Sequence, residues 1–546
     1  MGPGFNRMNA ITVQQTTQGL LKYMEDEFWG PAIKQLGVVI GYDGRHHSRE
    51  FAHIAAAVFV SRGVPVRLFS KVVPTPFVST GVRLLGCAAG IMITASHNPK
   101  EDNGYKVYWA NGCQIIPPLD AGIAAAIDSN LELWELEPAV LEGPYSSPLV
   151  ADPLDEVSSR YLANLSTALR CRTAAANVIA PLVAYTAMHG VGTPWVLQAF
   201  SSFGLPRPIL VTEQCDPDPE FPTVPFPNPE EGKGAWDLAF KTAQQYGVQL
   251  AFATDPDADR FAAAEQDPTT GRWRAFTGNE IGAMLAHWVL TNYLQQEGAL
   301  PVERLAMLSS TVSSRMLEGM ARQEGFHWQE TLTGFKWLGN EALQLEREGY
   351  TVLFAFEEAI GFMFGQVGKD KDGVAASVVF AELTADVYTR GLTLAQHWQQ
   401  LQQQYGAYEY RSGYIVAQPP SLSHAVFERL RSGYPQQIGG QRVTAVRDLG
   451  TGLDTSQEDR QAVLPWQPGD LMITFTLQGP ATLTLRASGT EPKLKFYLEV
   501  AGGKEGGAAA AELAEKLERA VAEELPDRPQ AEVGGVFIRT MGPQQQ

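Results

Sequence analysis

The sequence predicts an α/β protein with three related mixed α/β domains, followed by a smaller C-terminal α+β domain. Short β-rich runs alternate with helix-like runs over most of the chain, a pattern that is typical of βαβ units and largely parallel sheets. The alternation begins three times at similar spacing, whereas the last part has closely spaced strands. At 546 residues the chain is also too long for one core, because domains usually span roughly 100–200 residues.

The elements follow in order along the chain. The first block has strand-like runs at 38–43, 65–70 and 90–94 and a helix-like run at 48–63. The second block runs from the strand-like 181–188 to the strand-like 250–254, and the third from 305–310 through helix-like 313–325 and 341–349 to 351–358. After a Gln-rich helix at 393–406, strands at 472–477, 481–487 and 494–500 precede a helix around 508–524. We therefore predict domains at 1–165, 166–298, 299–407 and 408–546.

Composition excludes several classes of function. The 42 basic and 60 acidic side chains give a formal charge of −18, which opposes binding to nucleic acid or to an anionic membrane. No window supplies about 18 consecutive apolar residues, and the N-terminal residues lack the apolar core of a signal peptide. We expect a cytoplasmic monomer. The four cysteines form no C-x-x-C pair, so each is interpreted as a buried or half-buried small hydrophobic residue.

The first motif with possible chemistry is T-A-S-H-N-P-K at 94–100, directly after an apolar run. Ligands of open α/β sheets bind beyond the carboxyl ends of strands, where Ser96 would lie. Its hydroxyl could act as nucleophile or phosphate carrier, with His97, Lys100 and Lys106 supplying charge and proton transfer. The alternative is an ordinary turn, since Ser, Asn, Pro and Gly are common in turns.

The second motif is D-P-D-A-D-R at 255–260, again at the end of a β-rich run. Carboxylates at alternate positions of such a loop can converge on one Mg²⁺ ion through single oxygens. An EF-hand is excluded, because Asp259 is followed by Arg260 and not by glycine. A solvated acidic turn is the alternative.

The third motif is R-A-S-G-T-E-P-K at 486–493, between two strands of the last domain. Small residues there let backbone N–H groups approach an anion, while Arg486 offers a bidentate fork and Lys493 a further charge. This pattern favours a phosphate site, although Ser-Gly-Thr turns are common without one.

A fourth cluster combines T-G-F-K at 333–336, F-E-E-A-I-G at 356–361 and K-D-K-D-G at 369–373. Glu357 follows an apolar strand, where its carboxylate could accept hydrogen bonds from sugar hydroxyls; a strand-end charge pair with Glu358 is the alternative. Lys371 could face an anion or be a solvated lysine.

These motifs, in this order and one per domain, resemble the α-D-phosphohexomutase superfamily over essentially the whole chain. The runs VPTPFVS (73–79), NGYKVYW (103–109), LTGFKWLGN (332–340) and FEEAIGF (356–362) look most like its phosphoglucomutase-2 or phosphopentomutase branch. The resemblance implies four domains around a central cleft and an intramolecular phosphotransferase. This isomerase would interconvert ribose or deoxyribose 1- and 5-phosphates, glucose 1- and 6-phosphates, or both, with a sugar bisphosphate as intermediate and activator.

The resemblance also implies a role for each site residue. Ser96 would carry the phosphoryl group, and Asp255, Asp257 and Asp259 would hold Mg²⁺ together with a phosphoserine oxygen. Arg260 would steady the transferring group, and His97, Lys106 and Lys371 would serve in acid/base chemistry and positioning. The residues that would contact the substrate's sugar or its other phosphate are Thr333, Gly334, Glu357, Arg486, Ser488, Gly489, Thr490 and Lys493.

Two departures from the family pattern bear on function. An R-F-G-T-x-G-x-R segment usually precedes a stretch like Met1–Gly4, and nothing here matches it, which is consistent with an incomplete gene model or an altered first domain. Hexose-specific relatives have serine where this chain has Ala359, which argues against strict glucose specificity. The competing functions are a glucose-1,6-bisphosphate synthase and a non-catalytic protein that binds sugar phosphates.

Overall fold

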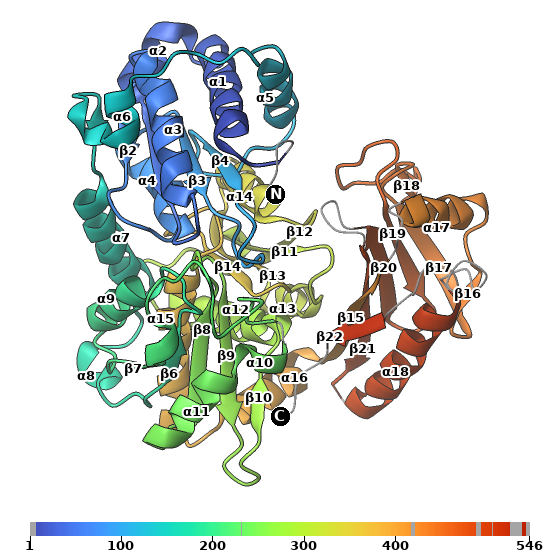
Figure 1. Ribbon diagram of the computed structural model, residues 1–546. Helices are drawn as coiled ribbons and strands as arrows, with labels where there is room; N and C mark the ends of the chain where they lie inside the picture. Colours follow the sequence, from blue (N-terminus) through green and yellow to red (C-terminus); the bar gives the residue numbers. More distant parts are fainter. Residues whose placement is uncertain are drawn as a thin grey trace. The chain divides into compact units, whose positions relative to one another are not determined.

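The computed structural model describes residues 7–230, 232–416, 421–487, 493–504, 506–524 and 538–541. Contacts divide the chain into two compact units (Figure 1). The first unit comprises the residues up to Ser309 together with Thr333–Leu394, and the second comprises Ser310–Leu332 together with the residues from Ala395 onward. Among the described residues, no helix has the length and apolar character needed to cross a membrane.

The first sheet has the order β4-β3-β1-β2-β5, in which only β4 is antiparallel to its neighbour. Its strands are β1 (Val38–Tyr42), β2 (Val66–Leu68), β3 (Ala89–Ile93), β4 (Tyr105–Trp109) and β5 (Val150–Ala151). The helices of this region are α1 (Ala10–Glu27), α2 (Trp29–Leu36), α3 (Ser48–Ser61), α4 (Thr75–Leu85), α5 (Leu119–Asp128), α6 (Pro138–Glu142) and α7 (Leu154–Leu169).

Strand β1 is buried on both faces, which explains its unbroken apolar sequence. Val38 and Ile40 belong to the core cluster that includes α1 and α3. On the opposite face Gly41 lies against Val78 of α4, so closely that a side chain there would collide. Successive residues of a strand point to opposite faces, so one short run serves both layers.

The second sheet has the order β10-β9-β8-β6-β7, with β7, β6 and β8 parallel and β9 and β10 antiparallel. Its strands are β6 (Ala184–Thr186), β7 (Ile209–Leu210), β8 (Leu250–Thr254), β9 (Phe261–Gln266) and β10 (Trp273–Ala275). The helices are α8 (Ala174–Asn177), α9 (Thr193–Phe203), α10 (Gly232–Ala235) and α11 (Asp237–Tyr246). Helix α11 ends at Tyr246 and is capped by Gly247, whose φ of 68° is a conformation that glycine adopts without a steric cost.

The third sheet repeats this arrangement in the first unit. Strand β11 (Leu305–Ser310) is parallel to β13 (Thr351–Glu357), and β14 (Gly361–Phe364) pairs with β13 antiparallel. The accompanying helices are α12 (Gly278–Leu294), α14 (Phe335–Arg347) and α15 (Gly373–Thr389). In all three sheets a parallel strand is thus followed by an antiparallel neighbour, as β3–β4, β8–β9 and β13–β14.

The second unit contains an antiparallel sheet with the order β16-β17-β19-β20-β21-β15-β22, and β18 pairs with β17. The strands of this sheet are β15 (Ala407–Val416), β16 (Gln437–Ile438), β17 (Gln441–Asp448), β18 (Leu453–Asp454), β19 (Met472–Leu477), β20 (Ala481–Ala487), β21 (Lys493–Gly503) and β22 (Ile538–Met541). Strand β12 (His327–Thr331) also belongs to the second unit but is not part of this sheet. Its helices are α13 (Met316–Glu324), α16 (Leu394–Tyr405), α17 (Ser421–Ser432) and α18 (Gly507–Glu524). Phe427 of α17 and Leu517 of α18 pack against one face of this sheet in a shared core.

The predicted fold class is confirmed: three mixed α/β sheets are followed by an α+β unit. The four domain boundaries stay predictions. Two local expectations need correction. Helix α14 begins at Phe335, before the predicted run at 341–349, because Gly334 with a φ of 115° reverses the chain there. Cys171 is exposed and not buried, because it lies in the turn after α7 whose backbone N–H groups bind Glu382.

Candidate active site

Three loops that follow equivalent strands form the candidate site. They follow β3, β8 and β13, and each leads into the antiparallel neighbour. Each loop holds one non-glycine residue in the left-handed region: Ser96 with φ 51°, Ala258 with φ 52° and Ile360 with φ 51°. That conformation costs about 1–2 kcal/mol for an L-residue and persists where the surroundings enforce it, often at functional sites.

Backbone hydrogen bonds hold the loops of the three sheets together. The N–H of Thr75, at the start of α4, donates to the carbonyl of Asp257 at 2.9 Å. The N–H of Phe261 donates to the carbonyl of Ile360 at 3.1 Å, and the N–H of Gly373 donates to that of Ala258 at 3.1 Å. Main-chain contacts therefore link the β8 loop to the β13 loop and to the start of α4, whereas the Ser96 loop reaches the β8 loop through the serine side chain.

The aspartates of the β8 loop are fully buried and share one arrangement. In each, one carboxylate oxygen accepts a hydrogen bond: Asp255 Oδ1 from the N–H of Arg260 at 3.0 Å, Asp257 Oδ2 from Lys106 at 2.7 Å and Asp259 Oδ2 from Lys106 at 3.1 Å. The other oxygen of each has no hydrogen-bond partner within the described residues. A buried carboxylate oxygen without a partner is costly unless a cation or another donor approaches it.

These aspartates have a geometry that suits a small divalent cation. One carboxylate oxygen from each of the three lies within 4.8 Å of those of the other two. In an octahedral Mg²⁺ site with bonds of about 2.1 Å, adjacent ligands are about 3.0 Å apart and opposite ligands about 4.2 Å, so the three oxygens must draw closer together to hold one ion. Burial and the like charges of Asp257 and Asp259 raise the pKa of Asp255 well above its ordinary value. The donor set therefore fits Mg²⁺.

Three cationic side chains surround the aspartates. Lys106 contacts Asp257 and Asp259, Lys371 Nζ lies 2.8 Å from Asp259 Oδ2, and Arg260 Nε lies 4.0 Å from Asp259 Oδ1. Burial lowers the pKa of Lys371, but Asp259 and Asp370 outweigh it and raise the pKa above its ordinary value. When all three aspartates are ionised, their charge balances that of the three cationic side chains, so a divalent cation arriving with a dianionic phosphoryl group leaves the net charge of the site unchanged.

Ser96 lies at the edge of the triad. Its Oγ donates to Asp257 Oδ2 at 3.2 Å, and its N–H donates to Thr94 Oγ1 at 2.9 Å. Burial and the nearby Arg260 hold the pKa of His97 well below its ordinary value. The structure thus brings the serine, the aspartates, both lysines and Arg260 together, although they come from separate segments of the chain.

The predicted sugar-binding residues of the first unit lie beside this cluster. Glu357 ends β13, and its Oε1 accepts from the N–H of Gly334 at 2.5 Å. Burial and Glu358 raise the pKa of Glu357 to about 7. Thr333 Oγ1 is buried and finds no hydrogen-bond partner in the part of the chain that the structure describes. Arg260 Nη1 donates to the carbonyl of Ala359 at 3.2 Å and links this loop to the aspartates.

The predicted phosphate-binding residues belong to the second unit. Arg486 lies near the end of β20, and Lys493 begins β21 with its Nζ 4.4 Å from the ring centroid of Tyr414. Ser488, Gly489 and Thr490 lie outside the described residues. The assignment of this loop to phosphate binding stays a prediction.

Sequence reasoning missed three residues that contact the site. Thr75 Oγ1 donates to Asp257 Oδ2 at 2.6 Å, Glu230 Oε2 lies 3.3 Å from Arg260 Nη1, and Arg45 donates to the carbonyl of Ser96 at 2.6 Å. Thr75 lies between two prolines in VPTPFVS, and Glu230 ends the Pro-rich run after 216. These proline-rich surroundings could have drawn attention to both residues, but they do not indicate which side chain either residue contacts.

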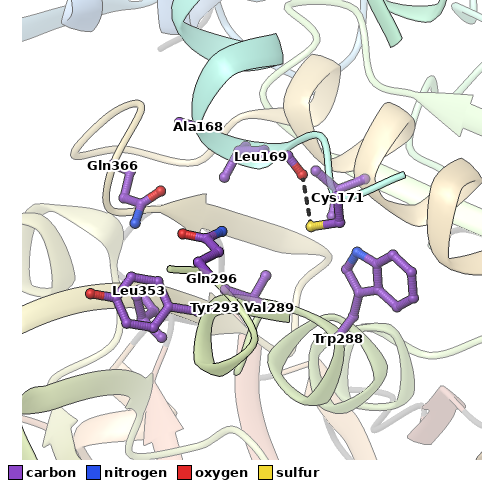
Figure 2. Close-up of a pocket in the computed structure, with 10 residues that line it drawn as sticks. Ala168, Leu169, Cys171, Trp288, Val289, Tyr293, Gln296, Leu353 and Gln366 are labelled. Atoms are coloured by element: carbon purple, nitrogen blue, oxygen red, sulfur yellow. Dashed lines mark hydrogen bonds between the residues drawn. The ribbon is translucent and has the colours of Figure 1, made fainter. Parts of the chain in front are cut away.

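A separate shallow pocket lies elsewhere in the first unit (Figure 2). Cys171, Trp288, Tyr293, Gln296 and Leu353 are among the residues that line it. Figure 2 shows Cys171 Sγ donating to the carbonyl of Leu169, at 3.3 Å. None of the residues predicted for catalysis lines this pocket.

Comparison with known proteins gives one family. Domains I, II and III of the phosphoglucomutase/phosphomannomutase family, each described as alpha/beta/alpha, match residues 3–133, 159–271 and 277–405. The chain is 46% identical to phosphopentomutase from Homo sapiens, covering 92% of this chain and 83% of that protein. It is 43% identical to glucose 1,6-bisphosphate synthase from Homo sapiens, covering 92% and 82%.

A solved structure shows the same fold. The phosphoglucomutase/phosphomannomutase family protein from Burkholderia thailandensis aligns with a TM-score of 0.67 at 16% identity, covering 98% of this chain and 97% of that one. The matched family domains contain the β3, β8 and β13 loops that form the candidate site. The chain therefore belongs to the phosphoglucomutase/phosphomannomutase family, as its resemblance to the α-D-phosphohexomutase superfamily predicts.

Proposed function

We propose that this protein is a phosphosugar mutase that interconverts pentose 1- and 5-phosphates and also accepts glucose 1- and 6-phosphates. One observation carries the proposal: the Ser96 hydroxyl lies 3.2 Å from Asp257 in a buried cluster of three aspartates, two lysines and an arginine. Phosphoryl transfer depends mainly on in-line positioning and charge neutralisation, and the cationic groups of this cluster support the second of these.

Asp255, Asp257 and Asp259 would hold Mg²⁺ together with an oxygen of phosphorylated Ser96. When bound, the ion would neutralise negative charge on the phosphoryl oxygens. The three carboxylate oxygens without a hydrogen-bond partner among the described residues support this role, since they need a cation when they are ionised.

The chain's own residues perform the transfer. A sugar hydroxyl attacks the phosphorus of phosphorylated Ser96 and the P–Oγ bond breaks. The hydroxyl proton passes to a basic group of the site, and Ser96 Oγ, the leaving group, takes up a proton from an acidic group there. Lys106, Lys371 and Arg260 oppose the negative charge of the moving group. The sugar bisphosphate then turns over, and its other phosphate returns to Ser96 by the same chemistry.

Contacts to the sugar and to its second phosphate complete the proposed site. The sugar hydroxyls would contact Glu357, Thr333 and Gly334. Glu357 ends β13 and binds the N–H of Gly334, and the neighbouring Thr333 hydroxyl has no hydrogen-bond partner among the described residues. Arg486, Ser488, Gly489, Thr490 and Lys493 would hold the phosphate that does not react. Because both ends of the bisphosphate intermediate carry a phosphate, this loop could bind either end while the other end reacts with Ser96.

A glucose-1,6-bisphosphate synthase is the second candidate function. The 43% identity to a protein of that name, close to the 46% for the phosphopentomutase, supports it. A synthase needs an external phosphoryl donor, whereas a mutase regains its phosphate from the bisphosphate. Location in the cytoplasm and the monomeric state stay predictions.

The test is ³¹P NMR of the purified protein with Mg²⁺ and ribose 1-phosphate or glucose 1-phosphate, with and without added sugar bisphosphate. The mutase predicts conversion to the 5- or 6-phosphate, and mass analysis should find one phosphate on Ser96. Ser96→Ala should lose turnover and still bind sugar phosphate. Bisphosphate accumulation that requires an external donor would favour the synthase, and phosphate on another residue of an active preparation would refute the role of Ser96.

A further inference from the structure

Arg45 lies beneath the loop that carries Ser96, although it follows a different strand. Arg45 is only 4% exposed. Its Nη1 donates to the carbonyls of Pro99 at 2.8 Å and Asp102 at 3.3 Å, and its Nη2 donates to those of Ser96 and Asn98, both at 2.6 Å. One guanidinium group thus binds four carbonyls of a single loop.

The remaining sides of this guanidinium group are also occupied. Nε lies 3.3 Å from Asp43 Oδ2, and the Phe221 ring centroid lies 5.0 Å from Cζ. Asp43 is itself held, because its Oδ1 accepts from the hydroxyl of Ser48 at 2.6 Å and the N–H of Arg45 at 3.0 Å. Buried and surrounded in this way, Arg45 is not placed to meet a substrate phosphate.

The loop needs such support, because Ser96 has a φ of 51°. A strained backbone persists only when surrounding contacts outweigh its preference for another conformation. Hydrogen bonds from a charged donor are roughly twice as strong as neutral ones, and Nη2 binds the carbonyl of the strained residue itself. The planar fork of arginine can reach four carbonyls at once, which the single ammonium group of lysine cannot.

We propose that Arg45 is a positioning residue for phosphoryl transfer: it fixes the Ser96 backbone so that Oγ stays beside the aspartate triad. The inference rests on the proposed mutase function. Arg45 touches no reacting atom and acts through the loop. A displacement of about 1 Å at a reacting group can cost about a hundredfold in rate, so loss of this support should lower kcat and leave KM nearly unchanged.

The experiment compares Arg45→Lys and Arg45→Ala with Arg172→Lys as the matched control. Arg172 is also a largely buried arginine of the first unit, bound to Asp386 and to the carbonyl of Ala176, but it lies away from the site. For Arg45→Lys we expect kcat to fall about a hundredfold with KM for sugar phosphate within about threefold. Arg172→Lys should retain wild-type kcat. Added guanidinium ion at non-denaturing concentration should restore part of the activity of Arg45→Ala and none to Ser96→Ala.

Hydrogen exchange of residues 94–104 gives a readout that does not depend on turnover. Faster exchange in this loop in Arg45→Lys than in wild type or Arg172→Lys is expected. Wild-type kcat in Arg45→Lys, or equal loss of kcat in both lysine variants, would overturn the inference. If wild-type protein converts no sugar phosphate, the proposed function fails, and an unchanged exchange rate in Arg45→Lys would then separately refute the role of Arg45.

Discussion

Replacement of Lys106 by methionine tests the charge balance of the site. The Lys106 ammonium group lies 2.7 Å from Asp257 and 3.1 Å from Asp259, and both carboxylates are fully buried. Methionine keeps the length of the side chain and removes its charge. Two buried carboxylates then lose a shared cation, so we expect the folded protein to be destabilised and turnover to fall.

The size of the effect follows from the contacts that remain. Removing one partner of a buried ion pair typically costs about 3–5 kcal/mol. Lys371 stays 2.8 Å from Asp259, and the side chain of Lys106 is 18% exposed. Both facts reduce the cost, so we expect a loss of about 2–3 kcal/mol in the free energy of unfolding. Without the competing ammonium group, Mg²⁺ should bind more tightly and stabilise the variant more than wild type.

Urea unfolding followed by tryptophan fluorescence, with EDTA or with Mg²⁺, measures both effects. Lys22→Met is the control, because the Lys22–Glu25 pair lies on the solvent-facing side of α1, with side chains 41% and 25% exposed, and its loss should cost less than about 1 kcal/mol. Equal stability of Lys106→Met and wild type in EDTA would refute this reasoning. So would a gain from Mg²⁺ that is no larger in the variant than in wild type.

Three further predictions concern the metal, the sugar and pH. Asp257→Asn should lower kcat far more than it changes KM, and exhaustive chelation should abolish wild-type turnover; full activity after chelation contradicts the magnesium assignment. Ala359→Ser should shift the kcat/KM ratio toward glucose 1-phosphate by about two- to tenfold, as expected for one hydrogen bond of about 0.5–1.5 kcal/mol; a wild-type preference for glucose above about a hundredfold refutes the pentose assignment. Burial raises the pKa of Glu499 to about 7, so stability should fall as pH rises from about 4.5 to about 7 and then level off. Glu499→Gln should remove up to about 3 kcal/mol of this dependence in urea melts at several pH values, and an unchanged pH profile contradicts it.

Much of the fold could be predicted from the sequence because its signals are local. Strands such as Leu250–Thr254 are apolar runs buried on both faces, and helices such as Ser48–Ser61 have their own periodicity. The loops at Ser96, Asp255–Asp259 and Glu357 follow such strands, so their place at strand ends was also predictable. The start of α14 and the exposure of Cys171 were not, since a turn at Gly334 and the binding of backbone N–H groups by Glu382 determine them.

The sequence by itself determined the three βαβ blocks, the order of the motifs and the chemical groups that each loop offers. Only the tertiary structure decided which groups meet. Lys106 is 151 residues from Asp257 in the chain, and the contact of Arg45 with Ser96 spans 51 residues. Neither contact has a local pattern: the first depends on how the first and second sheets pack at their strand ends, and the second on the pairing of β1 with β3. The pairing of β1 with β3 therefore decided which side chain supports the nucleophile, and the packing of the first two sheets decided which aspartate oxygens the lysine leaves for a cation.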